Sequence, residues 1–190
     1  LVPRPETELL VESIVMAAEA VGGDVKILDI GTGSGAIIVS LLDYLPQAKG
    51  VGVDISVGAL TVAKENAVAI GVAERAGFLR SDVYSALPLD KKFDIIVSNP
   101  PYIPSAEIQT LQREVKDYEP RLALDGGADG LDMYRRIAKD ASKYLNRGGV
   151  LIMEVGAGQA QEVVKLFKSC AYSMILKDFN NIDRYVKVVM

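Results

Sequence analysis

The sharpest chemical feature of the sequence is the tetrapeptide Asn99-Pro100-Pro101-Tyr102, which directly follows an apolar run. Proline after Asn99 biases that residue toward an extended conformation, and the two prolines fix their own φ angles and carry no N–H group. The stretch therefore presents acceptors without competing donors, so the Asn99 side-chain oxygen and the Pro100 carbonyl can converge on one NH₂ group. Tyr102 supplies a flat apolar wall beside them. The alternative interpretation is a rigid turn that ends a strand, with Asn99 as a cap of the local backbone.

A second feature is the glycine-rich run Gly31-Thr32-Gly33-Ser34-Gly35, which follows the apolar residues 25–30. Glycine lets the main chain turn tightly and approach a ligand without a Cβ atom in the way. The helix expected after this run offers free N–H groups at its start. The pattern predicts a site for a nucleotide-type cofactor, and its alternative is a plain turn from strand to helix.

Carboxylates follow the next two apolar runs. Asp54 comes 19 residues after Gly35, where a carboxylate can accept hydrogen bonds from both hydroxyls of a ribose. Its alternative role is to cap the next helix, for which Ser56 is an equally good candidate. Asp82 and Val83 follow a weaker run, where the carboxylate or its neighbouring backbone could take an adenine amino group while Val83 lies against the ring. Ser81-Asp82 could equally form a simple turn.

These residues can act together only if one sheet aligns them. The pattern predicts strands at residues 25–30, 50–55, 77–80, 93–98, 149–155, 172–178 and 184–190, and helices at 6–21, 35–45, 57–70, 131–146 and 159–169. Alternating strands and helices imply parallel strands with right-handed crossovers and helices on both faces. The last two strands are too close in sequence for a helical crossover, so one of them must run antiparallel. We expect a seven-stranded, mostly parallel α/β sheet with its ligands at the carboxyl edge.

The long stretch 103–130 is polar and mixed, and it exceeds an ordinary connection. We interpret it as a functional loop region with some helix, in which Tyr118 and Arg121 are candidates for ordering over a substrate. Glu154, at the end of the fifth expected strand, could line the pocket or face solvent.

Composition limits the chemistry. The chain has 190 residues, 49% of them hydrophobic, which predicts one domain with one core over residues 1–190. It has no histidine and a single cysteine, Cys170, which excludes Ser-His-Asp and Cys-His nucleophiles, histidine-ligated metals, internal disulfides and zinc–thiolate clusters. The net charge of −4 argues against non-specific nucleic-acid binding.

Location is also constrained by sequence. No apolar segment approaches the length of a membrane helix, and the acidic stretch Glu6-Thr7-Glu8 lies where a signal core would be. We expect a reducing, aqueous compartment such as the cytoplasm. The chain opens at Leu1 without methionine, which favours a domain excised from a longer protein.

The order LDIGTGSG, then Asp54, then SNPPY resembles the class I S-adenosylmethionine-dependent methyltransferases. Three further segments make the chain similar to the protein-(glutamine-N5) methyltransferases that modify peptide chain release factors, namely residues 3–8, 118–131 and 177–184. The resemblance covers essentially the whole chain and implies a Rossmann-like methyltransferase domain. Family members carry a small helical N-terminal domain ahead of the segment that begins here at Pro3, so we expect that docking domain to be absent from this chain.

The resemblance also implies roles for particular residues. In that family the Gly31–Gly35 loop, Asp54, and the Asp82-Val83 region hold S-adenosylmethionine, with S-adenosylhomocysteine as the product. Residues 99–102 hold the glutamine side chain, and Asn99 lies near both cofactor and substrate. The implied reaction methylates the glutamine of the Gly-Gly-Gln motif in release factors, without a metal.

Within this reaction we expect Asn99 and Pro100 to be the catalytic pair, each accepting one hydrogen of the glutamine amide. Arg4 and Thr7 are expected near the pocket without a defined role.

Other functions remain open. The residues Gly31-x-Gly33-x-x-Ala36 with Asp54 also fit the fingerprint of an NAD(P)-dependent oxidoreductase, although that interpretation leaves residues 99–102 unexplained. The same reaction could modify a glutamine of a ribosomal protein, or an exocyclic amino group of a base in DNA or RNA. The acidic net charge and the lack of a Lys/Arg-rich stripe argue against nucleic acid. A non-enzymatic binding module would not need the intact loop, Asp54 and Asn99.

Overall fold

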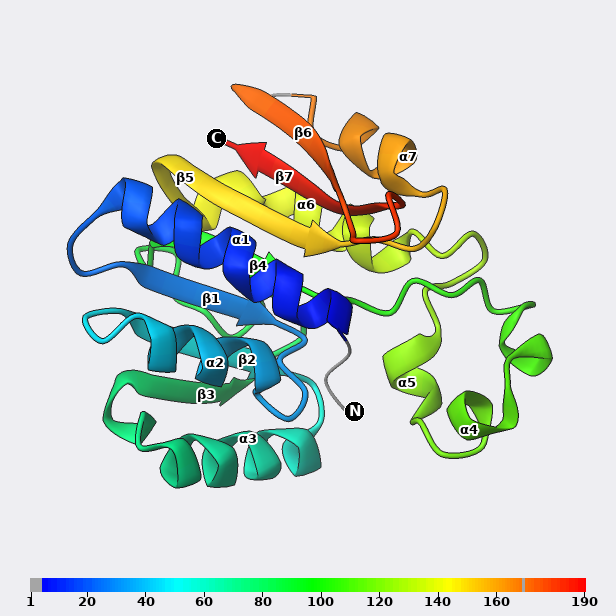
Figure 1. Cartoon of the computed structure of the whole chain (residues 1–190), viewed down its shortest axis with the longest axis horizontal. Helices are drawn as coiled ribbons and strands as arrows, with labels where there is room; N and C mark the ends of the chain where they lie inside the picture. The colour runs from blue at the N-terminus through cyan, green and yellow to red at the C-terminus, as the bar shows by residue number, and fades with distance from the viewer. Residues whose placement is uncertain (1–4, 169) are drawn as a thin grey trace.

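The apolar runs form a single sheet in the computed structural model, which describes residues 5–168 and 170–190 (Figure 1). The seven strands are β1 (Lys26–Ile30), β2 (Lys49–Asp54), β3 (Ala76–Arg80), β4 (Phe93–Ser98), β5 (Leu145–Glu154), β6 (Tyr172–Lys177) and β7 (Asp183–Val189). Their order across the sheet is β3-β2-β1-β4-β5-β7-β6.

Strand direction follows the length of the connections. The pairs β1–β2, β1–β4, β2–β3 and β4–β5 are parallel, whereas β7 is antiparallel to both β5 and β6. This arrangement confirms the predicted mostly parallel α/β sheet with an antiparallel strand at the carboxyl end of the chain. The order reverses between β1 and β4, which is the kind of position where open α/β sheets bind ligands.

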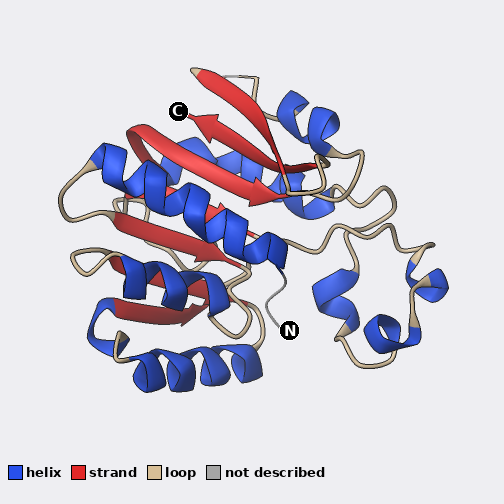
Figure 2. Cartoon of the chain, viewed as in Figure 1, coloured by secondary structure: helices blue, strands red, loops and turns tan. Residues whose placement is uncertain are grey.

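Helices cover both faces of the sheet (Figure 2). They are α1 (Pro5–Val21), α2 (Ala36–Tyr44), α3 (Val57–Ile70), α6 (Asp132–Tyr144) and α7 (Ala160–Lys165), with α4 (Arg113–Lys116) and α5 (Arg121–Leu124) outside these layers. Helices α1, α2 and α3 contribute to one buried cluster, and α6 and α7 to the other.

Adjacent strand residues belong to opposite faces of the sheet. In β1, Ile27 packs into the cluster under α1 and α2, and its neighbour Leu28 packs into the cluster under α6. Both side chains are fully buried. Because each face is covered, the central strands are apolar at nearly every position, which is why they are conspicuous in the sequence.

Two element boundaries differ from the prediction by more than two residues, and several others differ by one or two. Strand β5 begins at Leu145 rather than at residue 149, because its pairing with β4 shifts register between Phe93 and Ile95. Helix α7 ends at Lys165 rather than at residue 169. The N–H groups of Leu166 and Phe167 bond to carbonyls three residues back, which tightens the last turn and ends the helix.

Residues 103–130 leave the layered body as an arm that carries α4, α5 and the 3₁₀ turn Ile108–Thr110 (Figure 1). A short parallel bridge closes the neck of the arm, where the Ile103 N–H donates to the Leu124 carbonyl at 3.0 Å and Gly126 N–H donates to the Ile103 carbonyl at 2.8 Å. The expected loop region with some helix is therefore confirmed in form. None of the helices in the described part of the chain has the length and apolar character needed to cross a membrane.

Candidate functional site

The sheet brings the predicted site residues to one edge. In β1, Ile30 pairs with Ser98 of β4 on one side and with Val53 of β2 on the other. Gly31 and Asn99 therefore directly follow the neighbouring strands β1 and β4, and Asp54 is the last residue of β2 at the same edge. The next strand, β3, places Arg80 opposite Asp54, so the Ser81-Asp82 turn begins at the same edge.

The glycine-rich loop has a backbone that other residues would strain. Gly31, Gly33 and Gly35 have φ angles of 70°, 56° and 78°, in the left-handed region that favours glycine. A Cβ atom on Gly31 or Gly33 would meet nothing within 4 Å, so the loop faces open space there. A Cβ on Gly35 would instead lie 3.0 Å from the Ala63 Cβ of α3. The main chain at the first two glycines is thus open to close approach, and the third glycine permits close packing of α2 against α3.

Asp54 ties this loop to β2. Its Oδ2 accepts a hydrogen bond from the Gly33 N–H at 2.9 Å, and its Oδ1 accepts one from the Ser56 N–H at 2.8 Å. The cap of α3 is Ser56, whose hydroxyl oxygen accepts from the Ala59 N–H at 3.2 Å. Each carboxylate oxygen has a second acceptor position, so half-buried Asp54 keeps capacity for ligand hydroxyls.

The Asp82-Val83 region forms a strained turn. The Ser81 hydroxyl donates to the Val83 carbonyl at 2.9 Å and accepts from the Ala86 N–H at 3.0 Å. Val83 is buried and has a φ of 53°, which is unusual for a β-branched side chain. Exposed Asp82 pairs with Arg136 at 2.5 Å. The turn interpretation of Ser81-Asp82 is therefore correct, and the strain at Val83 favours a functional role for the same turn.

Contacts from Gln159 and Glu154 to Tyr102 support the Asn99–Tyr102 bend. Asn99 is half-buried beside the glycine loop, and Pro100 is buried. The Tyr102 carbonyl accepts a hydrogen bond from Gln159 Nε2 at 2.9 Å. The Tyr102 hydroxyl lies 3.5 Å from Oε1 of Glu154, which is 4% exposed. Glu154 therefore lies against the bend rather than in solvent.

Sequence reasoning assigned no role to three residues that shape this bend, namely Gly126 and Gly130, which lie in a segment that carries the family resemblance, and Gln159. A Cβ on Gly126 would lie 2.8 Å from the Cα of Tyr102, and a Cβ on Gly130 would overlap the Tyr102 carbonyl oxygen. The spacing of the glycines was visible in the sequence, but nothing there linked them to Tyr102.

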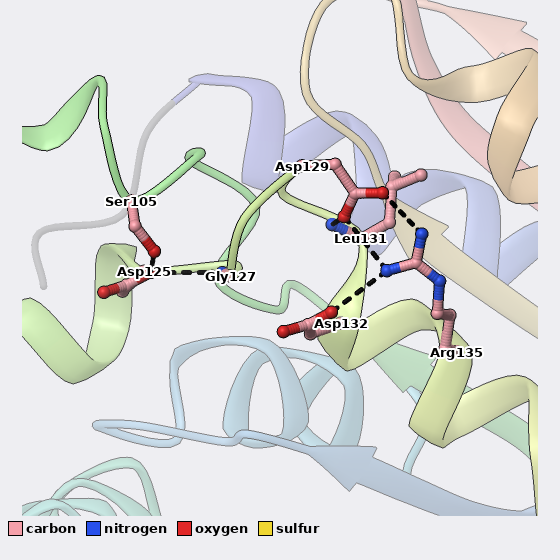
Figure 3. Close-up of polar contacts among 7 residues, drawn as sticks. All are labelled: Ser105, Asp125, Gly127, Asp129, Leu131, Asp132 and Arg135. Atoms are coloured by element: carbon pink, nitrogen blue, oxygen red, sulfur yellow. Dashed lines mark hydrogen bonds and ion pairs between the residues drawn. The ribbon is translucent and has the colours of Figure 1, made fainter.

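The loop that carries these glycines is fixed by charge (Figure 3). Asp125 Oδ1 accepts from the Ser105 hydroxyl at 2.5 Å and from the Gly127 N–H at 3.1 Å, and these bonds lower the pKa of Asp125. Asp129 forms an ion pair with Arg135 at 2.5 Å, and this partner lowers the pKa of Asp129 to about 2. The loop thus enters α6 with both carboxylates ionised at neutral pH.

The arm residues have different surroundings. Tyr118 is 83% exposed, so its ring is accessible from solvent. Arg121 forms an ion pair with Asp125 at 3.1 Å, at the neck of the arm. Arg4 and the side chain of Thr7 lie outside the described residues. The roles expected for all four residues stay predictions.

A buried carboxyl group lies beneath the glycine loop. Asp29 is fully buried in β1, and its Oδ2 accepts from the Thr32 hydroxyl at 2.6 Å. Its Oδ1 has no hydrogen-bond partner among the described residues. Burial raises the pKa of Asp29 to about 7, and the nearby charge of Asp54 adds to this effect. Asp29 stood inside the quoted motif, but its titration depends on burial that only the fold reveals.

We expect Asp29→Asn to stabilise the protein above pH 7. Because the pKa of Asp29 is raised by folding, the native state holds a proton that the unfolded chain releases between about pH 4 and 7. Wild-type stability therefore falls through that window and stays lower above it. Asparagine should remove that loss, worth up to about 4 kcal/mol for a shift of about three pKa units. Urea unfolding from pH 4 to 8 measures the effect, and parallel pH profiles of the two proteins would contradict it.

The fold and this edge define a methyltransferase domain, and comparisons with known proteins agree. The family model described as "Methyltransferase small domain" matches residues 5–127. The chain is 46% identical over 188 residues to the release factor glutamine methyltransferase of Geobacter sulfurreducens, covering 98% of this chain and 64% of that protein. It is 48% identical over 173 residues to the same-named protein of Bradyrhizobium diazoefficiens, covering 90% of this chain and 58% of that protein.

A solved structure gives the same relationship. The release-factor-specific protein-(glutamine-N5) methyltransferase of Alicyclobacillus acidocaldarius is 32% identical with a TM-score of 0.62, and the match covers 99% of this chain and 93% of that one. The chain belongs to this family of glutamine methyltransferases. It spans less than two thirds of the length of the two relatives above.

Proposed function

We propose that this chain is the catalytic domain of an enzyme that methylates the side-chain amide nitrogen of a glutamine in peptide chain release factors. The observation that carries the proposal is the register of β1 and β4, in which Ile30 lies opposite Ser98. This register sets the proline-containing bend that begins at Asn99 directly beside the open glycine-rich loop. Family membership supports the choice of a glutamine amide as the acceptor.

The residues present fit S-adenosylmethionine as the methyl donor. Open space above Gly31 and Gly33 can receive a ligand close to the main chain. Asp54 has remaining acceptor positions for ribose hydroxyls, and the turn at Asp82 and Val83 is at the correct edge for an adenine ring. Thr32, Ser34 and Gly35 complete the loop. The cofactor, when bound, supplies a methyl group already activated by a positively charged sulfur.

The protein's task is to orient a weak nucleophile. An amide nitrogen is a poor nucleophile because its lone pair is delocalised into the carbonyl. The Asn99 side-chain oxygen and the Pro100 carbonyl each accept one amide hydrogen, which aims the nitrogen lone pair at the methyl carbon. These contacts strengthen as the nitrogen gains positive character, so they stabilise the transition state more than the ground state. Pro101 and Tyr102 form the wall beside the amide, and the released proton passes to water.

A methyl-transfer assay with labelled cofactor tests this function. The substrates are a release factor, the same factor with Gln→Ala in its Gly-Gly-Gln motif, a ribosomal protein and duplex DNA. We expect label only on the unaltered release factor. Label on the Gln→Ala factor, on the ribosomal protein or on DNA, without label on the unaltered factor, would contradict the proposal. Titration with S-adenosylhomocysteine and with NAD separates the methyltransferase from the oxidoreductase interpretation.

The biological role of this activity, the domain organisation and the location of the protein are also proposals. A role in translation termination follows from the choice of release factors as partner. The single domain over residues 1–190, the separate docking domain and the cytoplasmic location stay predictions from the sequence.

A further inference from the structure

The stretch 154–159, from the end of β5 to the N-cap of α7, contacts Tyr102 at several atoms. Gln159 Nε2 donates to the Tyr102 carbonyl at 2.9 Å, and the Tyr102 hydroxyl lies 3.5 Å from Glu154 Oε1. A Cβ atom on Gly156 would lie 3.0 Å from Cδ2 of the Tyr102 ring, so the ring packs directly on this glycine. The segment therefore fixes where the Asn99–Tyr102 bend ends.

Gln159 connects this segment to Tyr102 most directly, because both ends of its side-chain amide form hydrogen bonds. Its Oε1 accepts from the Gly156 N–H at 3.1 Å, while its Nε2 donates to Tyr102. The side chain is half-buried at the N-cap position of α7. An amide bonded at both ends holds a set distance between the segment and the bend.

The surrounding backbone makes room for this amide. A Cβ on Gly130 would lie 2.5 Å from Gln159 Nε2, and a Cβ on Gly156 would lie 2.6 Å from Gln159 Oε1. Two glycines from different segments thus leave the space that the side chain fills. The Gln159 amide therefore occupies a space shaped by the surrounding backbone, unlike a surface side chain that merely lies near a neighbour.

We infer that Gln159 is a positioning residue for the substrate amide, acting through the Tyr102 carbonyl. The inference rests on the proposed function, because it assigns the bend to the glutamine substrate. Gln159 need not touch the substrate, since its effect is to hold the wall that the amide meets. Small displacements of a reacting group reduce rates steeply, by about 10²-fold for 1 Å.

Two substitutions separate the two bonds of Gln159. Glutamate keeps an acceptor for the Gly156 N–H but has no donor for the Tyr102 carbonyl, whereas methionine has no donor and only a weak sulfur acceptor. Exposed Gln161 lies in the same helix, and Gln161→Glu and Gln161→Met are matched controls. The readouts are kcat and KM for the release factor, the Kd for S-adenosylhomocysteine, and hydrogen exchange of the Gly156 amide.

We expect kcat to fall about 10-fold in both Gln159 variants, with the Kd for S-adenosylhomocysteine unchanged. The Gly156 amide should stay protected in Gln159→Glu and exchange faster in Gln159→Met. If the donor to Tyr102 is what matters, both variants lose activity. If Gln159 acts only by bonding the Gly156 N–H, only Gln159→Met loses activity. The Gln161 variants should behave as wild type.

Two results would overturn the inference. One is a wild-type kcat in Gln159→Glu. The other, which does not depend on activity, is an unchanged ¹³C resonance of the Tyr102 carbonyl in both Gln159 variants, because loss of the hydrogen bond must shift it. A wild-type protein that binds S-adenosylhomocysteine but does not methylate the release factor would refute the proposed function, and the carbonyl resonance would still decide whether Gln159 holds the bend.

Discussion

Asn99→Ala is expected to lower the rate of methyl transfer by about 10²–10³, with little change in cofactor affinity. Removing one transition-state acceptor costs about 3–4 kcal/mol in comparable sites. The loss should fall on kcat, because the contact strengthens as the amide nitrogen gains positive character. Asn99→Asp keeps an acceptor oxygen at the same position and should retain more activity than alanine.

Single-turnover kinetics and titration with S-adenosylhomocysteine measure the two quantities separately. Exposed Asn180, in the turn between β6 and β7, provides a matched control as Asn180→Ala. Equal losses of rate and cofactor affinity in Asn99→Ala would reject the catalytic assignment, because they would indicate a general disturbance of the site.

The second large effect is expected for Gly130→Ala, which should cost about 2–5 kcal/mol of stability and most of the activity. Gly130 has a φ of 76°, where an alanine costs about 1–2 kcal/mol. Its new Cβ would also overlap the Tyr102 carbonyl and displace Gln159, and such overpacking adds about 1–3 kcal/mol. The bend that holds the substrate would have to move.

Gly148→Ala is the matched control for this change. Gly148 has a φ of 78°, and a Cβ there would meet nothing within 4 Å. It should therefore show the conformational cost alone, about 1–2 kcal/mol, with normal activity. Urea unfolding and methyl-transfer assays compare the two variants. Equal stability losses would mean that Gly130 has no packing role against Tyr102.

Both predictions also test how the site depends on the residues that hold the bend in place. Asn99 is proposed to contact the substrate, whereas Gly130 and Gln159 contact the Tyr102 carbonyl. If these contacts position the bend, mutations of Gly130 and Gln159 should reduce activity without changing cofactor affinity. The Asp29→Asn variant is different, because it alters the underside of the cofactor loop.

The sequence by itself determined the elements and the chemical groups at their ends. Strands buried on both faces are nearly continuous apolar runs, so β1, β2, β4 and β5 were visible from the local sequence pattern alone. Glycine and proline restrict the backbone locally, which made residues 31–35 and 99–102 recognisable without any tertiary information. The short connection before β7 likewise predicted its antiparallel direction.

Only the tertiary structure decided which distant groups meet. The bonds from Gly33 to Asp54 and from Gln159 to Tyr102 join residues separated by 21 and 57 positions. No local pattern encodes such contacts, because they arise from strand register and helix packing. The raised pKa of Asp29 has the same origin, since desolvation depends on everything that covers a side chain. Local backbone preferences can therefore be predicted from a sequence, whereas burial and long-range contacts exist only in the folded chain.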